Sequence, residues 1–318
     1  MNTNYYILFA GLLVALELGY FALARRFGIL DQPNHRSLHV QPTIRGGGII
    51  FFVAALLGYI WIPLDQPLFL SGLILISVIG FMDDVKGLGS GVRFMIQCMA
   101  IALSMAQVGL DVPWYGLGMV FIVGVGLLNA YNFMDGINGI TSGYSLVTLG
   151  SLVWINMETP FIDKDFLGCL ILGVGIFSYF NFRTKAICFA GDVGSLSMGF
   201  VLLYAIATLI KSTNQFAYIF LVALYAVDTG LTLLHRMWLR ENIFKAHKMH
   251  FFQLMVNQFG LSHVKTSLIY SMVQLVINII LIIVISSHTI SPLIVGTLFV
   301  MVLAVVYGYF KFYYRISH

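Results

Sequence analysis

Long apolar runs recur along the whole chain and dominate its pattern. They cover approximately residues 5–24, 46–63, 68–82, 93–109, 114–130, 140–156, 167–181, 195–210, 216–234, 266–286 and 290–310. A helix of about twenty apolar residues crosses a bilayer, and most of the runs approach that length. The pattern predicts an all-α, polytopic membrane bundle of about eleven transmembrane helices, with ten as the alternative.

Composition supports a membrane protein built as one domain. Of the 318 residues, 59% are hydrophobic and 9% are charged, with a mean hydropathy of +0.92. A soluble domain cannot bury that much apolar surface, so we expect residues 1–318 to form one transmembrane domain. The net charge of +4 does not suggest a nucleic-acid partner. The three cysteines show no paired spacing, which supports neither a disulfide framework nor a zinc site.

The basic residues are distributed very unevenly between the loops. If the spans alternate from a periplasmic N-terminus, only Lys164 and Lys211 of the 17 Lys and Arg residues fall on the outer side. Basic loops face the cytoplasm, so the other side is predicted to be cytoplasmic, and the C-terminus with it. The cytoplasmic loops then lie near residues 25–45, 83–92, 131–139, 182–194 and 235–263. The acidic and amide clusters at the ends of the apolar runs are therefore expected on the cytoplasmic face of the membrane.

Two adjacent carboxylates, Asp83 and Asp84, end one apolar run on this face. Their mutual repulsion raises one pKa unless a cation lies nearby, so the pair suits either a general base or the positioning of Mg²⁺ and phosphate. The alternative is a solvated pair neutralised by Lys86.

A second polar cluster contains Asn129, Asn132, Asp135 and Asn138. On a helical end, the spacing of three places the first three on nearly one face. Their oxygens and amides suit a hard cation, or a nucleobase and its sugar. A capping network could use one or two of them.

The segment Gly191-Asp192-Val193-Gly194-Ser195 precedes another apolar run and is typical of a helix N-terminus. Free N–H groups at such an end favour phosphate, and Asp192 could hold Mg²⁺ that bridges to it. The simpler interpretation is an N-cap.

The loop at 235–263 contains a compact cationic group, Lys245, His247, Lys248 and His250. Such a group suits a diphosphate, and positive-inside anchoring is the alternative. A zinc site lacks a third soft ligand. Asp228, in the inner third of its span, fits equally a site residue or a packed hydrogen-bond partner.

Together these segments resemble the polyprenyl-phosphate N-acetylhexosamine-1-phosphate transferase superfamily, of the glycosyltransferase family 4 type. The matches follow the family's order almost throughout the chain: Gly28–Gly47 with Arg36, His39 and Arg45, then Asp83-Asp84 with Arg93, then Asn129–Gly139, Gly191–Leu196, and His247 with His250. The resemblance implies transfer of N-acetylhexosamine-1-phosphate from a UDP-sugar to undecaprenyl phosphate, with membrane lipid around the protein. UMP and an undecaprenyl-diphospho-sugar would be the products, and the family is compatible with a homodimer.

The resemblance also implies roles for individual residues. Asp192 and Asn132 would bind Mg²⁺, with Mn²⁺ as a substitute, and Asp83 with Asp84 would deprotonate or orient the lipid phosphate. The remaining positions would contact the nucleotide-sugar: Arg93, Lys245, His247 and His250 at the diphosphate, Asn129, Asp135 and Asn138 in the sugar-nucleotide pocket, and Arg36, His39 and Arg45 from the first loop.

Two departures from the family pattern bear on the sugar. Many bacterial members have an aspartate where this chain has Asn138, and many GlcNAc-1-phosphate transferases carry His-x-His-His where this chain has His250-Phe251-Phe252-Gln253. The pattern looks closer to the subgroup that starts O-antigen synthesis with UDP-GlcNAc or a 6-deoxy analogue such as UDP-FucNAc or UDP-QuiNAc.

Two rival functions are considered. A secondary transporter predicts carboxylates near the bilayer midplane and internal repeats, whereas these acids gather at one face. A CDP-alcohol phosphotransferase predicts aspartates in a single compact stretch. Direct attack by the lipid phosphate is favoured over a phospho-aspartyl intermediate, because no isolated nucleophile stands out.

Overall fold

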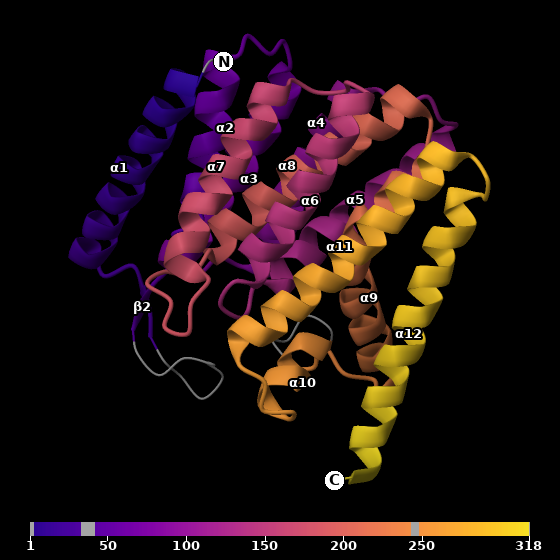
Figure 1. The fold of residues 1–318 in the computed structure, drawn as a ribbon. Helices are drawn as coiled ribbons and strands as arrows, with labels where there is room; N and C mark the ends of the chain where they lie inside the picture. Colours follow the sequence, from indigo (N-terminus) through magenta and orange to yellow (C-terminus); the bar gives the residue numbers. More distant parts are fainter. Residues whose placement is uncertain (1–2, 33–41, 243–247, 318) are drawn as a thin grey trace.

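The computed structural model describes residues 3–32, 42–242 and 248–317, with side chains up to Lys311. Within these ranges the chain forms twelve α-helices, one 3₁₀ helix and one two-stranded antiparallel sheet (Figure 1). The first half contains α1 (Thr3–Phe27), β1 (Leu30–Asp31), β2 (Thr43–Ile44), α2 (Ile49–Trp61), α3 (Pro67–Lys86), α4 (Ser90–Val108), α5 (Trp114–Met134) and α6 (Ile140–Glu158). The second half contains α7 (Lys164–Asn181), α8 (Gly191–Thr213), η1 (Phe216–Val222), α9 (Ala223–Trp238), α10 (Phe251–Asn257), α11 (His263–Ser287) and α12 (Pro292–Ser317).

Every predicted apolar run lies in a helix, which confirms the all-helical bundle. The run at 216–234 is divided into η1 and α9, and α10 is an additional short helix within the loop at 235–263. At the junction between η1 and α9, a buried side-chain amide of α11 bonds to backbone groups on both sides. Gln274 Nε2 donates to the Phe220 carbonyl (3.1 Å), and its Oε1 accepts the Leu224 N–H (3.0 Å). Such a partner is required where backbone groups lose their helical bonds in an apolar interior.

In the described part of the chain, eight helical segments are long and apolar enough to cross a membrane: α1, α3, α4, α5, α8, η1 with α9, α11 and α12. The other three predicted spans are α2, which has 13 residues, α6 and α7. These three helices pack in the same bundle, but they are not among the eight candidate spans. The total of eleven spans and their orientation therefore stay a prediction. The start of α1 and the end of α12 lie at opposite ends of the bundle (Figure 1).

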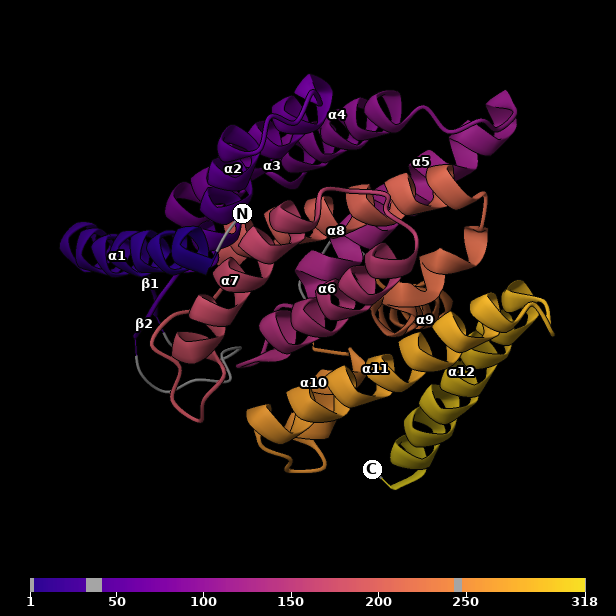
Figure 2. The ribbon, with the colours of Figure 1, turned by 45° about the horizontal axis from the view of Figure 1, so that its top comes forward.

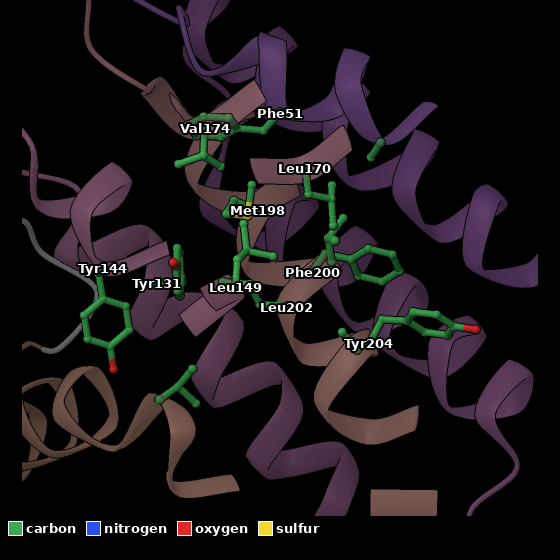
Figure 3. Packing of buried hydrophobic residues seen from close by; sticks show 14 of the residues in the cluster. Phe51, Tyr131, Tyr144, Leu149, Leu170, Val174, Met198, Phe200, Leu202 and Tyr204 are labelled. Atoms are coloured by element: carbon green, nitrogen blue, oxygen red, sulfur yellow. The ribbon is translucent and has the colours of Figure 1, made fainter. Parts of the chain in front are cut away.

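The centre of the bundle is α8, most of whose side chains are buried. It packs against α2, α3 and α5 (Figure 2). Aromatic rings fill the interior around it: Phe69 stacks on Tyr204 with centroids 4.2 Å apart, and Tyr144 stacks on Tyr225 at 3.6 Å. Figure 3 shows this packing around Phe200 and Tyr131. The burial fixes the N-terminus of α8 relative to its neighbours.

Polar segments from distant parts of the chain meet at one end of this core. Ile44 of β2 forms a parallel bridge with Cys188, directly before α8. The C-terminal end of α3 lies beside the N-terminus of α8, because Asp84 accepts the N–H groups of Asp192 and Val193. This end of the bundle therefore gathers several of the predicted site residues.

Candidate active site

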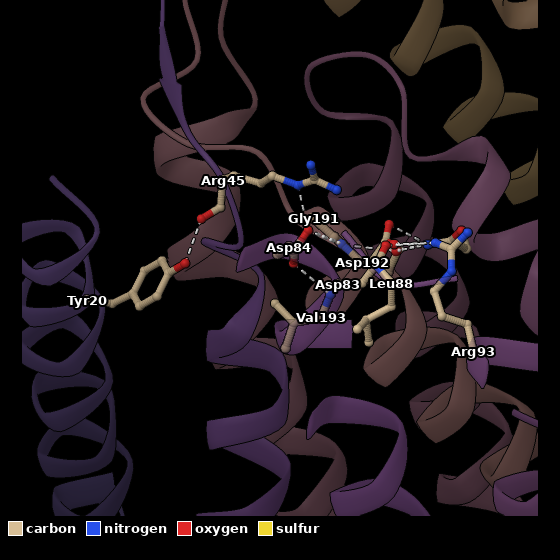
Figure 4. A network of polar contacts seen from close by, with 11 residues as sticks. Tyr20, Arg45, Asp83, Asp84, Leu88, Arg93, Gly191, Asp192 and Val193 are labelled. Carbon is tan, nitrogen blue, oxygen red and sulfur yellow. Dashed lines mark hydrogen bonds and ion pairs between the residues drawn. The ribbon is translucent and has the colours of Figure 1, made fainter. Parts of the chain in front are cut away.

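Asp84 joins three segments at the site (Figure 4). Its Oδ1 accepts the Asp192 N–H (3.0 Å) and Arg45 Nε (2.7 Å), and its Oδ2 accepts the Val193 N–H (3.0 Å). A carboxylate at a helix N-terminus satisfies N–H groups that have no helical partner and interacts favourably with the helix dipole. Asp84 is therefore the cap of α8, supplied by another helix 108 residues away in sequence.

The first residue of α8 must be a glycine for this contact to form. Gly191 has a φ of +70°, and a Cβ there would lie 2.5 Å from Asp84 Oδ2. Only a residue without a side chain combines that backbone conformation with such a close approach.

Asp83 and Asp192 are linked by one guanidinium. Arg93 Nη1 donates to Asp83 Oδ2 (2.7 Å) and to Asp192 Oδ2 (2.8 Å), and Asp83 Oδ1 also accepts the Leu88 N–H. Two carboxylates so close together repel, and the arginine between them offsets that repulsion. The predicted neighbours Asp83, Arg93 and Asp192 thus lie together, although each comes from a different helix (Figure 4).

Asn132 completes this cluster from the last turn of α5. Its Nδ2 donates to Asp192 Oδ1 and to Ser195 Oγ, each at 3.0 Å. The two predicted metal ligands are therefore adjacent. A metal ion would require the oxygen of the amide to face Asp192, a change that a rotation of the amide supplies.

Asp135 lies just beyond α5, half-buried beside the same cluster. The Thr141 hydroxyl donates to its Oδ1 (2.6 Å). Burial raises the pKa of Asp135 to about 6, and the negative charge of Asp84 adds to the shift, while the Thr141 hydroxyl and the Gly191 N–H oppose it. This carboxyl thus titrates nearer neutrality than an exposed aspartate.

The other two asparagines have local partners. Asn129 Nδ2 donates to the Val125 carbonyl of its own helix (2.8 Å). Asn138 is 5% exposed, and its Nδ2 donates to the carbonyls of Arg183 (2.9 Å) and Thr184 (3.2 Å). Asn138 thereby holds the α5–α6 connection to the segment before α8, while the proposed contacts of both asparagines with substrate stay predictions.

The predicted cationic residues that the structure describes lie in two places. Arg45 and Arg93 lie at the site with partly exposed side chains. His250 is 3% exposed, and its Nδ1 lies 3.4 Å from Asp228 Oδ1. Arg36, His39, Lys245 and His247 lie outside the described residues.

Several contributors to the site were not singled out by the sequence. Thr141 bonds to Asp135, and the Tyr20 hydroxyl donates to the Arg45 carbonyl (2.6 Å). Hydroxyl groups on apolar helices give no signal of their own in a sequence. The carboxylate of Asp228 accepts hydrogen bonds at both oxygens, which agrees with its interpretation as a packed hydrogen-bond partner.

Comparison with known proteins identifies a family segment within this chain. Residues 67–210 match the model of glycosyl transferase family 4. This segment of the chain belongs to the family. The matched segment of family 4 runs from the start of α3 almost to the end of α8, so it contains Asp83, Arg93, Asn132 and Asp192 together.

Relatives align over most of the chain. It is 25% identical to the probable undecaprenyl-phosphate N-acetylglucosaminyl 1-phosphate transferase of Bacillus subtilis strain 168, covering 81% of this chain and 77% of the relative. It is 26% identical to the decaprenyl-phosphate N-acetylglucosaminephosphotransferase of Mycolicibacterium smegmatis, covering 79% and 75%. A phospho-N-acetylmuramoyl-pentapeptide-transferase of Enterococcus hirae is 28% identical, covering 83% and 91%.

Proposed function

We propose that this protein transfers N-acetylhexosamine-1-phosphate from a UDP-sugar to undecaprenyl phosphate. Its family and the names of its relatives support a polyprenyl-phosphate sugar-phosphate transferase. The observation that carries the proposal is the chain of contacts Asp83–Arg93–Asp192–Asn132, which brings two carboxylates, a guanidinium and an amide together from four helices. Such a set suits a reaction between two anionic phosphates.

In the proposed reaction an oxygen of the lipid phosphate attacks the β-phosphorus of the UDP-sugar. A new phosphorus–oxygen bond forms, the bond from the β-phosphorus to the bridging oxygen breaks, and UMP leaves with the electron pair. Asp83 accepts the proton of the lipid phosphate or orients that phosphate, and Arg93 offsets negative charge beside it. Asp84 acts indirectly, since its bonds hold α8 and therefore Asp192 in place.

The oxygen ligands present fit Mg²⁺. Among the described residues, no group of three or more His, Cys, Asp or Glu side chains is placed to hold a metal ion. Mg²⁺, however, is usually held by one or two carboxylates together with water and substrate phosphates. Asp192 and Asn132 would hold it, with Mn²⁺ as a substitute. When bound, the ion would neutralise charge on the diphosphate.

The sugar and the pathway are narrower proposals. The run from His247 to Gln253 favours UDP-GlcNAc or a 6-deoxy analogue such as UDP-FucNAc or UDP-QuiNAc, and hence the start of O-antigen or another cell-envelope glycan. The distribution of basic residues supports a site on the cytoplasmic face of a bacterial inner membrane. A soluble nucleotide and a lipid phosphate at headgroup depth would meet there.

The test is UMP release by the purified protein, with undecaprenyl phosphate, Mg²⁺ and a panel of donors. The panel contains UDP-GlcNAc, UDP-FucNAc, UDP-QuiNAc and UDP-N-acetylmuramoyl-pentapeptide. We expect release with one of the first three, and loss of release in Asp192→Asn with its thermal stability retained. Release with the pentapeptide donor alone would contradict the sugar assignment, and full activity of Asp192→Asn would contradict the site.

A further inference from the structure

Asp228 is a buried carboxylate that has no part in the proposed reaction. It lies on α9 and is 2% exposed. Its oxygens accept the Phe251 N–H (2.9 and 3.1 Å), the Tyr270 hydroxyl (2.6 Å) and the Thr232 hydroxyl (3.2 Å). A charge at this depth is costly unless it is well hydrogen-bonded, so its partners indicate what it is for.

These partners come from three helices around the start of α10. Phe251 is the first residue of α10, and the Phe252 N–H makes a longer contact of 3.5 Å with Asp228 Oδ2. Tyr270 belongs to α11. The Thr232 hydroxyl also contacts the Tyr307 hydroxyl of α12 (2.8 Å). Figures 1 and 2 show α9, α10, α11 and α12 together at this side of the molecule.

Asp228 also fixes the residue before α10. His250 Nδ1 lies 3.4 Å from Asp228 Oδ1, within ion-pair distance, and the His250 N–H donates to Gln253 Oε1 (3.2 Å). The backbone and the imidazole of His250 are thus both restrained. A carboxylate next to an imidazole commonly sets the orientation of the ring.

The start of α10 packs directly on the candidate site. The ring of His250 lies 6.3 Å from that of Phe133 between centroids. The ring of Phe252 approaches Gly136 so closely that a Cβ there would lie 2.9 Å from its Cζ. Phe133 and Gly136 flank Asp135, and Phe133 directly follows Asn132. A displacement of α10 would therefore also displace Phe133 and Gly136 beside Asp135, which is predicted to contact the nucleotide-sugar.

We propose that Asp228 is a positioning residue that holds His250 and the first turn of α10 against the segment Phe133–Gly136. The proposal rests on the proposed function, because it assigns His250 and this segment to the binding of the UDP-sugar. Asp228 itself touches no reacting atom. It acts through the placement of His250, and its removal should weaken binding of the nucleotide substrate rather than of the lipid.

The first test compares Asp228→Asn, which keeps the side-chain volume, with the wild type in the UMP-release assay. We expect KM for the UDP-sugar to rise roughly tenfold, because hydrogen bonds to a charged group are lost, with kcat and KM for undecaprenyl phosphate within about twofold. Tyr270→Phe removes one donor to the same carboxylate and should raise the same KM roughly threefold. If Asp228→Asn does not fold, Tyr270→Phe decides.

The second test asks whether the effect passes through His250. His250→Ala should raise KM for the UDP-sugar, and Asp228→Asn should add little in that background, since coupled residues are not additive. The matched control is Asp163→Asn, which removes a carboxylate that caps α7 and should leave every constant unchanged.

Unchanged KM for the UDP-sugar in both Asp228→Asn and Tyr270→Phe would overturn the proposal. It would also be overturned if the rise in this KM in the double variant equalled the product of the rises in Asp228→Asn and His250→Ala. Failure of the wild type to release UMP from any UDP-sugar would instead refute the proposed function.

Discussion

Replacing Asp84 by asparagine tests the central packing contact of the site. The substitution removes the negative charge and leaves one oxygen where there were two. If that oxygen keeps the Asp192 N–H and Arg45, the Val193 N–H loses its acceptor and faces an amide N–H instead.

The cost follows from these contacts. A lost hydrogen bond to a charged group costs about 1.5–3 kcal/mol. Loss of the charge at the N-terminus of α8 adds about 0.3–2 kcal/mol. The sum, about 3 kcal/mol, corresponds to a melting temperature lower by roughly 5 °C for a chain of 318 residues. Because Asp192 is the second residue of α8, it moves with the helix, and a displacement near 1 Å should also lower kcat roughly a hundredfold.

The assay is thermal unfolding of the detergent-purified protein, followed by UMP release at saturating substrates. The matched control is Asp163→Asn at the exposed N-terminus of α7, where the side chain accepts the Asp165 N–H (2.7 Å) and the Phe166 N–H (3.3 Å). Because Asn and Asp cap helices about equally well, it should cost only the interaction of the charge with the helix dipole, about 0.3–1 kcal/mol, and leave UMP release unchanged. The reasoning is refuted if Asp84→Asn destabilises no more than this control, or if it retains full UMP release.

Two further predictions concern the segment beyond α5. The raised pKa of Asp135, about 6 against a lower unfolded value, means that its ionisation opposes folding. The associated stability is complete at acid pH and is lost as the pH rises through the folded pKa. In EDTA, the melting temperature of Asp135→Asn should therefore rise relative to that of the wild type as the pH increases from about 4 to 7. A difference in melting temperature that does not change with pH would contradict this. Gly136→Ala should displace Phe252, lower stability by about 1–3 kcal/mol and raise KM for the UDP-sugar, whereas Gly150→Ala, which meets no atom within 4 Å, should do neither.

Much of the architecture follows from the sequence because its cause is local. Each helix that could cross a membrane appears as an apolar run, since the transfer of apolar side chains into hydrocarbon depends on composition over about twenty residues. The positions of Asp83, Asn132 and Asp192 at the ends of such runs likewise follow from local sequence. Their assembly at one end of the bundle is what alternating helices require.

The partners of these side chains were decided only by tertiary packing. Asp84 accepts the N–H of Asp192, 108 residues away, and the amide of Asn138 bonds to carbonyls 45 and 46 residues away. Neither contact has a sequence signature, because hydrogen bonding depends on distances and angles that only the packed helices set. The sequence placed His250 in a cationic loop, and the fold placed its imidazole against Asp228. The chain alone thus determined which chemical groups reach the site's end of the bundle, while the close approach of α3, α8, α9 and α10 decided which of them bond to one another.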